Sequence, residues 1–318
     1  MYIGIDGGGT HSTGVLCDGA GRVLARREGG GMNFHTRGMD AVRDEIHELT
    51  EALLRDAGVS AGKVCLGLAA LDAPAEKPVL EELITDPLKR EEVRMVSDTA
   101  IALWGLTRGG SGMIMICGTG SMMEAMDDAG RTWVRGGWGY RLGDPLSGYS
   151  LAVGGLRAVF RAEEHLGPQT SLRASALSAF SAENPRKMLD ALYAPECTPA
   201  RLALFAEAVT EAARAGDPAA VQVVEGEIGE MAEAAGVFLR EVPGIRRVGL
   251  HGGIFAHNPW IRTAMADRLR EGFPDLCVDV PEAPPEIGAV WMRMAEEHAL
   301  TDRVAEETIR SYKEWMKT

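Results

Sequence analysis

The stretch MYIGIDGGGTHSTGVL, residues 1–16, begins with an apolar run that carries Asp6 at its end. Three glycines and two hydroxyl side chains follow, and the chain then alternates like a strand. This order predicts a strand, a tight turn and a second strand. Glycine lets an anion approach the backbone N–H groups, and an acid beside the turn can hold the water shell of a magnesium ion. A plain glycine-rich hairpin explains the stretch equally well, because short motifs often match by chance.

The pattern returns at residues 113–134. An apolar strand over 113–116 leads into a second glycine and hydroxyl turn at 118–121, and residues 122–126 form the return strand. The Ala-Gly-Arg turn at 129–131 repeats the one at 20–22, and a third short strand follows each. The repeat predicts duplicated halves. Two such turns facing each other would hold phosphates better than one.

Composition limits the classes of partner. The chain has 318 residues, enough for two domains, and a net charge of −13 with no Lys/Arg run longer than two. We therefore expect no nucleic-acid and no membrane partner, and no apolar stretch is long enough to span a bilayer. The five cysteines are isolated, which favours free thiols in a reducing cytoplasm over disulfides or a zinc site. The N-terminus enters a strand at once, so no signal peptide is expected.

Strands and helices alternate along the first part of the chain. We expect helices at 39–57, 77–84 and 99–106, and strands at 23–27, 64–68 and 93–96. This alternation is typical of an α/β domain. Another strand is expected at 276–280.

Residues 149–242 are rich in Ala, Leu and Glu, and predict about four helices. The clearest has Asp217 as its N-cap and Pro218 at its first position. Its glutamates, at 225, 227, 230 and 233, are expected to form a solvated face.

Three side chains are candidates for chemistry. Ser97 and Asp98 follow a strand, where the simplest role is that one of them caps a helix, but phosphoryl transfer to a hydroxyl needs a carboxylate such as Asp98 to take the proton. Asp144, between a glycine and a proline, either accepts hydrogen bonds from a sugar or forms an Asx turn. Trp138 either stacks on a sugar or lies in the core. A P-loop motif is absent, and the chain after Gly9 enters a strand where the dinucleotide fingerprint needs a helix.

The order of these motifs resembles the N-acetylglucosamine kinase group of the BadF/BadG/BcrA/BcrD ATPase-type family, within the actin–hexokinase–Hsp70 superfamily. The resemblance rests on residues 6–10, 97–98, 118–121, 136–139 with 143–144, and 252–253, and spans nearly the whole chain. It implies an α/β fold of two actin-like (ribonuclease H-like) domains flanking a nucleotide cleft. The first domain would be 1–108 joined by the C-terminal helix 301–318. The second would be 109–300, with a helical insertion at about 149–243.

The resemblance also implies an activity, namely ATP-dependent phosphorylation of a hydroxyl on an amino sugar such as N-acetylglucosamine or glucosamine. Its cofactors would be ATP and Mg²⁺, and we expect a cytoplasmic homodimer. Asp98 would be the catalytic base that activates the sugar 6-hydroxyl, and Asp6 would hold the magnesium through water. The residues implied at the phosphates are Gly7, Gly8, Gly9, Thr10, Gly118, Thr119, Gly120 and Ser121. Those implied at the adenosine are Gly252 and Gly253, and those at the sugar are Asn33, Trp138, Gly139 and Asp144.

Two departures from the family's pattern bear on the sugar. The family commonly continues Gly-Asp with Glu-Gly-Ser, whereas this chain has Pro145, Leu146 and Ser147, which changes the polarity beside the sugar. Residues 68–72 also lack the Ser or Gly pattern often seen after that strand. Two other functions stay open, an ATPase that activates a 2-hydroxyacyl-CoA dehydratase through an interfacial iron–sulfur cluster and a non-catalytic sugar sensor. The cluster would need cysteine ligands, which are isolated here.

Overall fold

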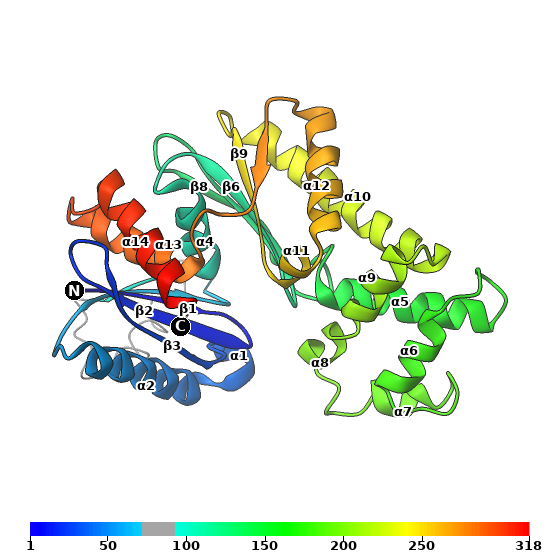
Figure 1. Cartoon of the computed structure of the whole chain (residues 1–318). Coiled ribbons are helices and arrows are strands. Elements are labelled where there is room, and N and C mark those ends of the chain that lie inside the picture. The colour runs from blue at the N-terminus through cyan, green and yellow to red at the C-terminus, as the bar shows by residue number, and fades with distance from the viewer. Residues whose placement is uncertain (72–92, 318) are drawn as a thin grey trace. The chain divides into compact units, whose positions relative to one another are not determined.

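The computed structural model describes residues 1–71 and 93–317 (Figure 1). The helix predicted at 77–84, and Asp72 at the end of the unusual 68–72 segment, lie outside the described residues. The chain forms two compact units. Unit 1 comprises Met1–Gly112 and Val280–Thr318, and unit 2 comprises Met113–Asp279.

Unit 1 contains a five-stranded sheet in the order β3-β2-β1-β4-β5. Its strands are β1 (Tyr2–Gly7), β2 (His11–Cys17), β3 (Val23–Gly30), β4 (Lys63–Leu68) and β5 (Val93–Ser97). The first three pair antiparallel, and β1, β4 and β5 run parallel. The predicted strands are confirmed, but β3 continues through the glycines that were expected to end it, because Gly30 pairs with His11.

Helices cover both faces of this sheet. On one face, Ile3, Ile5 and Leu16 form a core with the apolar stripe of α2 (Met39–Ala57), which follows the short α1 (Phe34–Arg37). On the other, Tyr2 and Val15 pack against α13 (Pro285–Glu296), beside α4 (Asp98–Thr107) and α14 (Asp302–Trp315) (Figure 1). Successive strand residues point to opposite faces, so one strand supplies both cores.

The helix α13 packs very tightly in unit 1. A Cβ atom on Gly4 would lie 2.0 Å from the carbonyl oxygen of Glu286, and one on Gly288 would lie 2.0 Å from that of Ile101. Only glycine permits these approaches. The packing units therefore differ from the predicted domains, which placed residues 109–300 together. The C-terminal α14 also packs in unit 1, where Trp315 donates its indole N–H to the carbonyl of Val23 over 3.0 Å.

Unit 2 repeats the strand order of unit 1. Its sheet has the order β10-β9-β6-β7-β8, so β6 to β10 correspond in turn to β1 to β5. The strands are β6 (Gly112–Cys117), β7 (Ser121–Met126), β8 (Thr132–Gly136), β9 (Arg247–His251) and β10 (Cys277–Asp279). The strands β6, β9 and β10 run parallel, and β7 and β8 antiparallel. This shared order confirms the duplication predicted from the sequence.

The helical part of unit 2 has more, shorter helices than predicted. It consists of α5 (Gly148–Glu163), α6 (Leu172–Ala179), α7 (Met188–Leu192), α8 (Pro199–Ala203), α9 (Ala206–Arg214) and α10 (Pro218–Glu241). Beside the sheet lie α11 (Gly253–His257) and α12 (Pro259–Gly272), and α12 packs on α10 (Figure 1). The predicted cap of α10 is confirmed, because Asp217 accepts hydrogen bonds from the N–H groups of Ala219 and Ala220.

Among the described residues, none of the helices combines the length and the apolar composition needed to cross a membrane.

Candidate active site

In unit 1, the first group of predicted site residues lies at the carboxyl ends of the parallel strands. Asp6 on β1 pairs with Gly67 on β4, and Leu68 at the end of β4 pairs with Ser97 at the end of β5. The turn at residues 8–10 and the start of α4 therefore lie at one edge of the sheet. This edge is where ligands bind in open α/β sheets.

The turn after β1 is packed on one side and open on the other. The carbonyl of Gly8 accepts a hydrogen bond from the N–H of Met32 over 2.8 Å. A Cβ atom on Gly31 would lie 2.3 Å from the carbonyl oxygen of Gly9, so residues 31–32 support the turn closely. Gly9 and Thr10 are exposed. Their N–H and hydroxyl groups are thus in a position to meet a ligand.

The helix cap at the start of α4 is Ser97. Its Oγ accepts the N–H of Ala100 over 3.1 Å and the hydroxyl of Thr99 over 2.9 Å. Asp98 occupies the first position of the helix, where the helix dipole favours a negative charge. The role of cap, one of the two explanations considered for residues 97–98, therefore belongs to Ser97.

Two other carboxylates of unit 1 act on Asp6. Burial raises the pKa of Asp6 well above its usual range, and the charges of Glu286 and Asp98 raise it further. Glu286 is buried and accepts a hydrogen bond from the hydroxyl of Tyr312 on α14. A cation would relieve the repulsion among these acids. Within the described residues, however, no group of three or more His, Cys, Asp and Glu side chains is arranged to bind a metal directly.

Asn33 precedes α1 and caps it. Its Oδ1 accepts the N–H of His35 over 3.0 Å. Asn33 follows Met32, whose N–H is bonded to the carbonyl of Gly8, so the predicted sugar contact lies next to the predicted phosphate turn in space.

In unit 2, two predicted groups of residues meet at the ends of β6 and β9. These parallel strands pair Ile116 with His251. Gly252 then adopts φ +99°, and a Cβ atom there would lie 2.4 Å from the carbonyl oxygen of Cys117. The structure thus brings the turn at 118–121 together with the predicted adenosine residues Gly252 and Gly253.

The turn at 118–121 is joined to the segment that contains Asp144. The hydroxyl of Ser121 donates to the carbonyl of Pro145 over 2.6 Å, and the N–H of Gly148 donates to the carbonyl of Gly118 over 2.7 Å. A Cβ atom on Gly120 would lie 2.7 Å from Oδ2 of Asp144, which is buried. Ser121 is buried as well, so its hydroxyl holds the loop together, while Thr119 is exposed.

The loop before Asp144 presents Trp138 to solvent. Its side chain is 77% exposed, so its alternative assignment to the core is wrong. Gly139 adopts φ +82° and its carbonyl accepts the N–H groups of Leu142 and Gly143, which closes the loop. A Cβ atom on Gly143 would lie 3.1 Å from that of Trp138. The exposed indole is therefore available to a ligand.

Glu227 is a residue that the sequence interpretation missed. It was placed on a solvated face of α10, but its carboxylate is partly buried and accepts hydrogen bonds from the N–H of Leu146 and the hydroxyl of Ser150. Helical spacing alone gives one sign of this, since Glu227 lies next to the buried Ile228 and three residues after the buried Val224.

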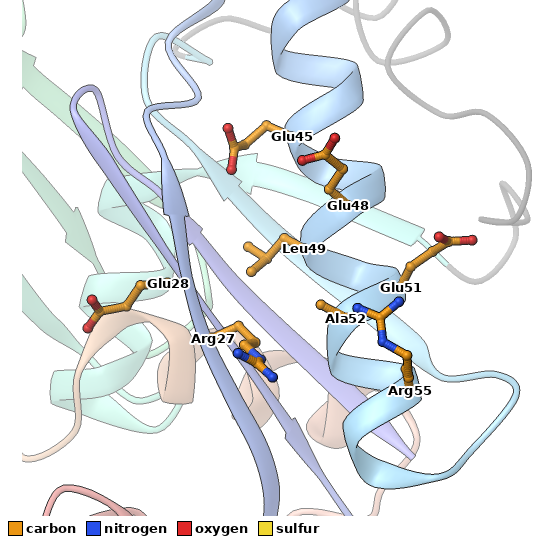
Figure 2. A pocket seen from close by; sticks show the side chains of 8 residues that line it. All are labelled: Arg27, Glu28, Glu45, Glu48, Leu49, Glu51, Ala52 and Arg55. Atoms are coloured by element: carbon orange, nitrogen blue, oxygen red, sulfur yellow. The ribbon is translucent and has the colours of Figure 1, made fainter.

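A separate hollow of about 450 Å³ lies between β3 and α2 of unit 1 (Figure 2). Figure 2 shows that its lining is mainly charged and comes from the strand and the helix. Arg27 is paired with Asp56, and Glu45 accepts the N–H of Gly30. Its lining contains none of the predicted site residues: it consists of Arg27, Glu28, Glu45, Glu48, Leu49, Glu51, Ala52 and Arg55.

All five cysteines are free thiols. Cys17, Cys65 and Cys117 are buried, Cys197 is half-buried and Cys277 is exposed. Burial raises the pKa of Cys65 to about 12, and burial also raises the pKa of Cys17 and of Cys117. The buried thiols are therefore protonated and behave as small core residues.

Comparison with known proteins identifies relatives along most of the chain. The model of the BadF/BadG/BcrA/BcrD ATPase family matches residues 3–291. An N-acetyl-D-glucosamine kinase of Dictyostelium discoideum is 31% identical over 208 residues, which are 62% of this chain and 65% of that protein, just under two thirds of its length. An N-acetylmuramic acid/N-acetylglucosamine kinase of Clostridium acetobutylicum is 28% identical over 218 residues, covering 68% of this chain and 71% of the relative.

Solved structures agree with the two-unit fold. A protein of Chromobacterium violaceum, provisionally named an N-acetylglucosamine kinase, superposes with a TM-score of 0.75 at 27% identity, covering 92% of this chain and 98% of its own. A ROK family glucokinase of Streptomyces griseus has a TM-score of 0.58 at 16% identity and covers 92% of this chain and 98% of its own. The likeness to the glucokinase shows the fold alone. The predicted actin-like α/β fold is confirmed.

Proposed function

This chain belongs to the BadF/BadG/BcrA/BcrD ATPase family, and on that premise we propose that it transfers the terminal phosphoryl group of ATP to a hydroxyl of an amino sugar. N-acetylglucosamine and glucosamine are the first candidates, because the relatives named above phosphorylate sugars of this class. Family membership implies the use of ATP. The choice of hydroxyl and of sugar rests on the resemblance.

One observation carries the proposal. Both sheets have the same strand order, and in both a glycine turn follows the central strand at the carboxyl edge. In unit 1 that edge also holds Asp98, and in unit 2 it holds Gly252. A duplicated anion-binding turn with one carboxylate base beside it matches what phosphoryl transfer to an alcohol requires.

The nucleotide would be bound mainly by backbone groups. Exposed Gly9, Thr10 and Thr119 offer N–H and hydroxyl donors to phosphate oxygens, supported by the packed sides of their turns. Donors that are fixed before the reaction stabilise the charge of the transition state without reorganising. Gly252 and Gly253, which lie beside the second turn, would leave room for the adenosine.

Asp98 would act as the general base. Its carboxylate would accept the proton of the attacking hydroxyl as the oxygen approaches the γ-phosphorus, and would orient that hydroxyl in line. The charge of Asp98 contributes to raising the pKa of Asp6, so these two carboxylates lie close enough to interact. Exclusion of water from the site would prevent the hydrolysis of ATP.

A magnesium ion fits the acids of unit 1. Asp6 would hold it through water, and the repulsion that raises the pKa of Asp6 is what a divalent cation would offset. When bound, the ion supplies positive charge to the β- and γ-phosphates.

The sugar would lie near Asn33, Trp138, Gly139 and Asp144. Trp138 is exposed and can stack on a sugar ring, and the glycine at 139 leaves the backbone accessible. Asp144 is buried against Gly120, so its contribution would come through the carboxylate edge that faces the turn. The homodimer and the cytoplasmic location remain predictions from the sequence.

The test is a coupled ADP-release assay with a panel of sugars, amino sugars and anhydro-sugars. We expect an amino sugar to accelerate ADP release, and Asp98→Asn to lower kcat by about 10²- to 10⁴-fold while ADP still binds. Asp40→Asn, on the exposed side of α2, is the matched control and should keep full activity. If no sugar accelerates ADP release, the kinase proposal fails, and sugar binding without turnover would support the sensor.

A further inference from the structure

The segment that carries Asp144 has an unusual backbone. Asp144 adopts φ +63° and Leu146 adopts φ +58°, with Pro145 between them. Residues other than glycine rarely occupy this left-handed region, and Leu146 is fully buried in it. Surrounding contacts must therefore hold the segment in place.

Glu227 supplies those contacts from another helix. Its Oε2 accepts the N–H of Leu146 over 2.7 Å and the hydroxyl of Ser150 over 2.8 Å. Ser150 in turn closes a capping box with Ser147 at the start of α5. Burial raises the pKa of Glu227, while these two hydrogen bonds favour its charged form. The carboxylate thus joins α10, the left-handed turn and the start of α5.

The same segment holds the turn at 118–121. Pro145, which directly precedes Leu146, accepts the hydroxyl of Ser121 over 2.6 Å. The N–H of Gly148 donates to the carbonyl of Gly118 over 2.7 Å, and that of Tyr149 donates to the carbonyl of Thr119 over 3.3 Å. A continuous chain of hydrogen bonds and peptide links therefore runs from Glu227 to the turn.

We propose that Glu227 is a positioning residue that keeps the segment 144–150 latched to the turn at 118–121, so that this turn presents its backbone to the nucleotide phosphates. The inference rests on the proposed function, because that function assigns the turn to the phosphates. It predicts that loss of the Glu227 carboxylate weakens the binding of phosphates and leaves the binding of adenosine intact.

The experiment compares the affinity for ADP with that for adenosine, by calorimetry, in the full-length wild type and four variants. We expect Glu227→Ala to weaken the affinity for ADP at least tenfold and to leave the affinity for adenosine within twofold of the wild type. Glu227→Gln keeps an oxygen that can accept both hydrogen bonds but removes the charge that strengthens them, and Ser150→Ala removes one donor, so the ADP affinity of both variants should fall between those of the wild type and Glu227→Ala. Glu233→Gln changes an exposed glutamate of the same helix and should match the wild type.

Each outcome decides the matter. A selective loss of ADP affinity supports the inference. An equal loss for both ligands identifies Glu227 as merely structural, and unchanged affinities overturn the inference as well. If Glu227→Ala does not fold, Glu227→Gln and Ser150→Ala are judged by the same comparison. A wild type that binds ADP no tighter than adenosine contradicts the proposed function itself, whereas selective wild-type binding with unaffected variants contradicts the inference alone.

Discussion

Replacing Gly252 by alanine tests the close approach between β9 and β6. Gly252 has φ +99° and ψ 167°, a combination that is essentially confined to glycine. A Cβ atom there would lie 2.4, 2.7 and 3.0 Å from the carbonyl oxygen, carbonyl carbon and nitrogen of Cys117. All three are backbone atoms of a central strand and cannot rotate away as a side chain could.

The magnitude follows from two contributions. The strained backbone conformation costs about 1–3 kcal/mol for a residue with a side chain. Forcing a methyl group into packed backbone costs about 1–3 kcal/mol more. We therefore expect Gly252→Ala to lower the free energy of unfolding by about 4 kcal/mol, which lowers the Tm by about 8–16 °C in a unit of this size.

The adjacent Gly253→Ala is the matched control. The nearest atom to its Cβ would be Cδ2 of His257 at 3.9 Å, and it lies at the start of a helix, where alanine is well tolerated. The assay is thermal unfolding followed by circular dichroism, with adenosine affinity measured on the folded proteins. If Gly252→Ala unfolds within 2 °C of the wild type, or if both variants lose stability equally, the packing argument is refuted.

Two further predictions concern stability at acid pH. Asp217→Ala should lower the free energy of unfolding by about 2 kcal/mol, because the Asp217 carboxylate caps α10 and also accepts the N–H of Ser171 over 2.6 Å. Burial alone would raise the pKa of Asp217, but hydrogen bonds from Ser171 and Ala220 bring it below its usual value, so the stability difference should shrink below about pH 4. Denaturation at pH 7 and at pH 3 checks this, and a difference that persists at pH 3 would contradict it. Burial lowers the pKa of His251 to about 4, so between pH 4 and about 6.5 the unfolded chain binds the extra proton and the wild type loses stability as the pH falls. His251→Gln should reduce this loss of stability, as measured by urea titrations across that pH range. An identical pH slope in both proteins would refute the assignment.

Local signals in the sequence were sufficient for most elements. Alternating apolar residues around the two glycine turns predicted the hairpins, and the Asp217-Pro218 pair predicted the start of α10. These signals succeed because hydrophobic period, caps and turn residues act over a few positions. The predictions of where β3 ends and of how many helices unit 2 contains were less accurate, because strand pairing and short helical turns depend on distant partners.

Features that arise from contacts between distant residues were not predictable. Glu227 is one of several glutamates along α10, and only the packing of α10 against the start of α5 turns its carboxylate toward Leu146. Glu286 stands in an apolar helical stripe, and its partner Tyr312 lies on another helix. Helical spacing gives one sign that Glu227 is partly buried, but it does not identify the partner of either carboxylate.

For the opening stretch MYIGIDGGGTHSTGVL, the sequence alone determined the hairpin, the glycine turn and, through the repeat at 113–134, the duplication of the fold. Only the tertiary structure decided which groups of each turn are available. Gly9, Thr10 and Thr119 are exposed, while Ser121 is bonded to Pro145 and Ser97 caps α4 in front of Asp98. The physical reason is that a turn's shape follows from its own residues, whereas the burial and hydrogen bonding of its donors depend on the segments that pack against it.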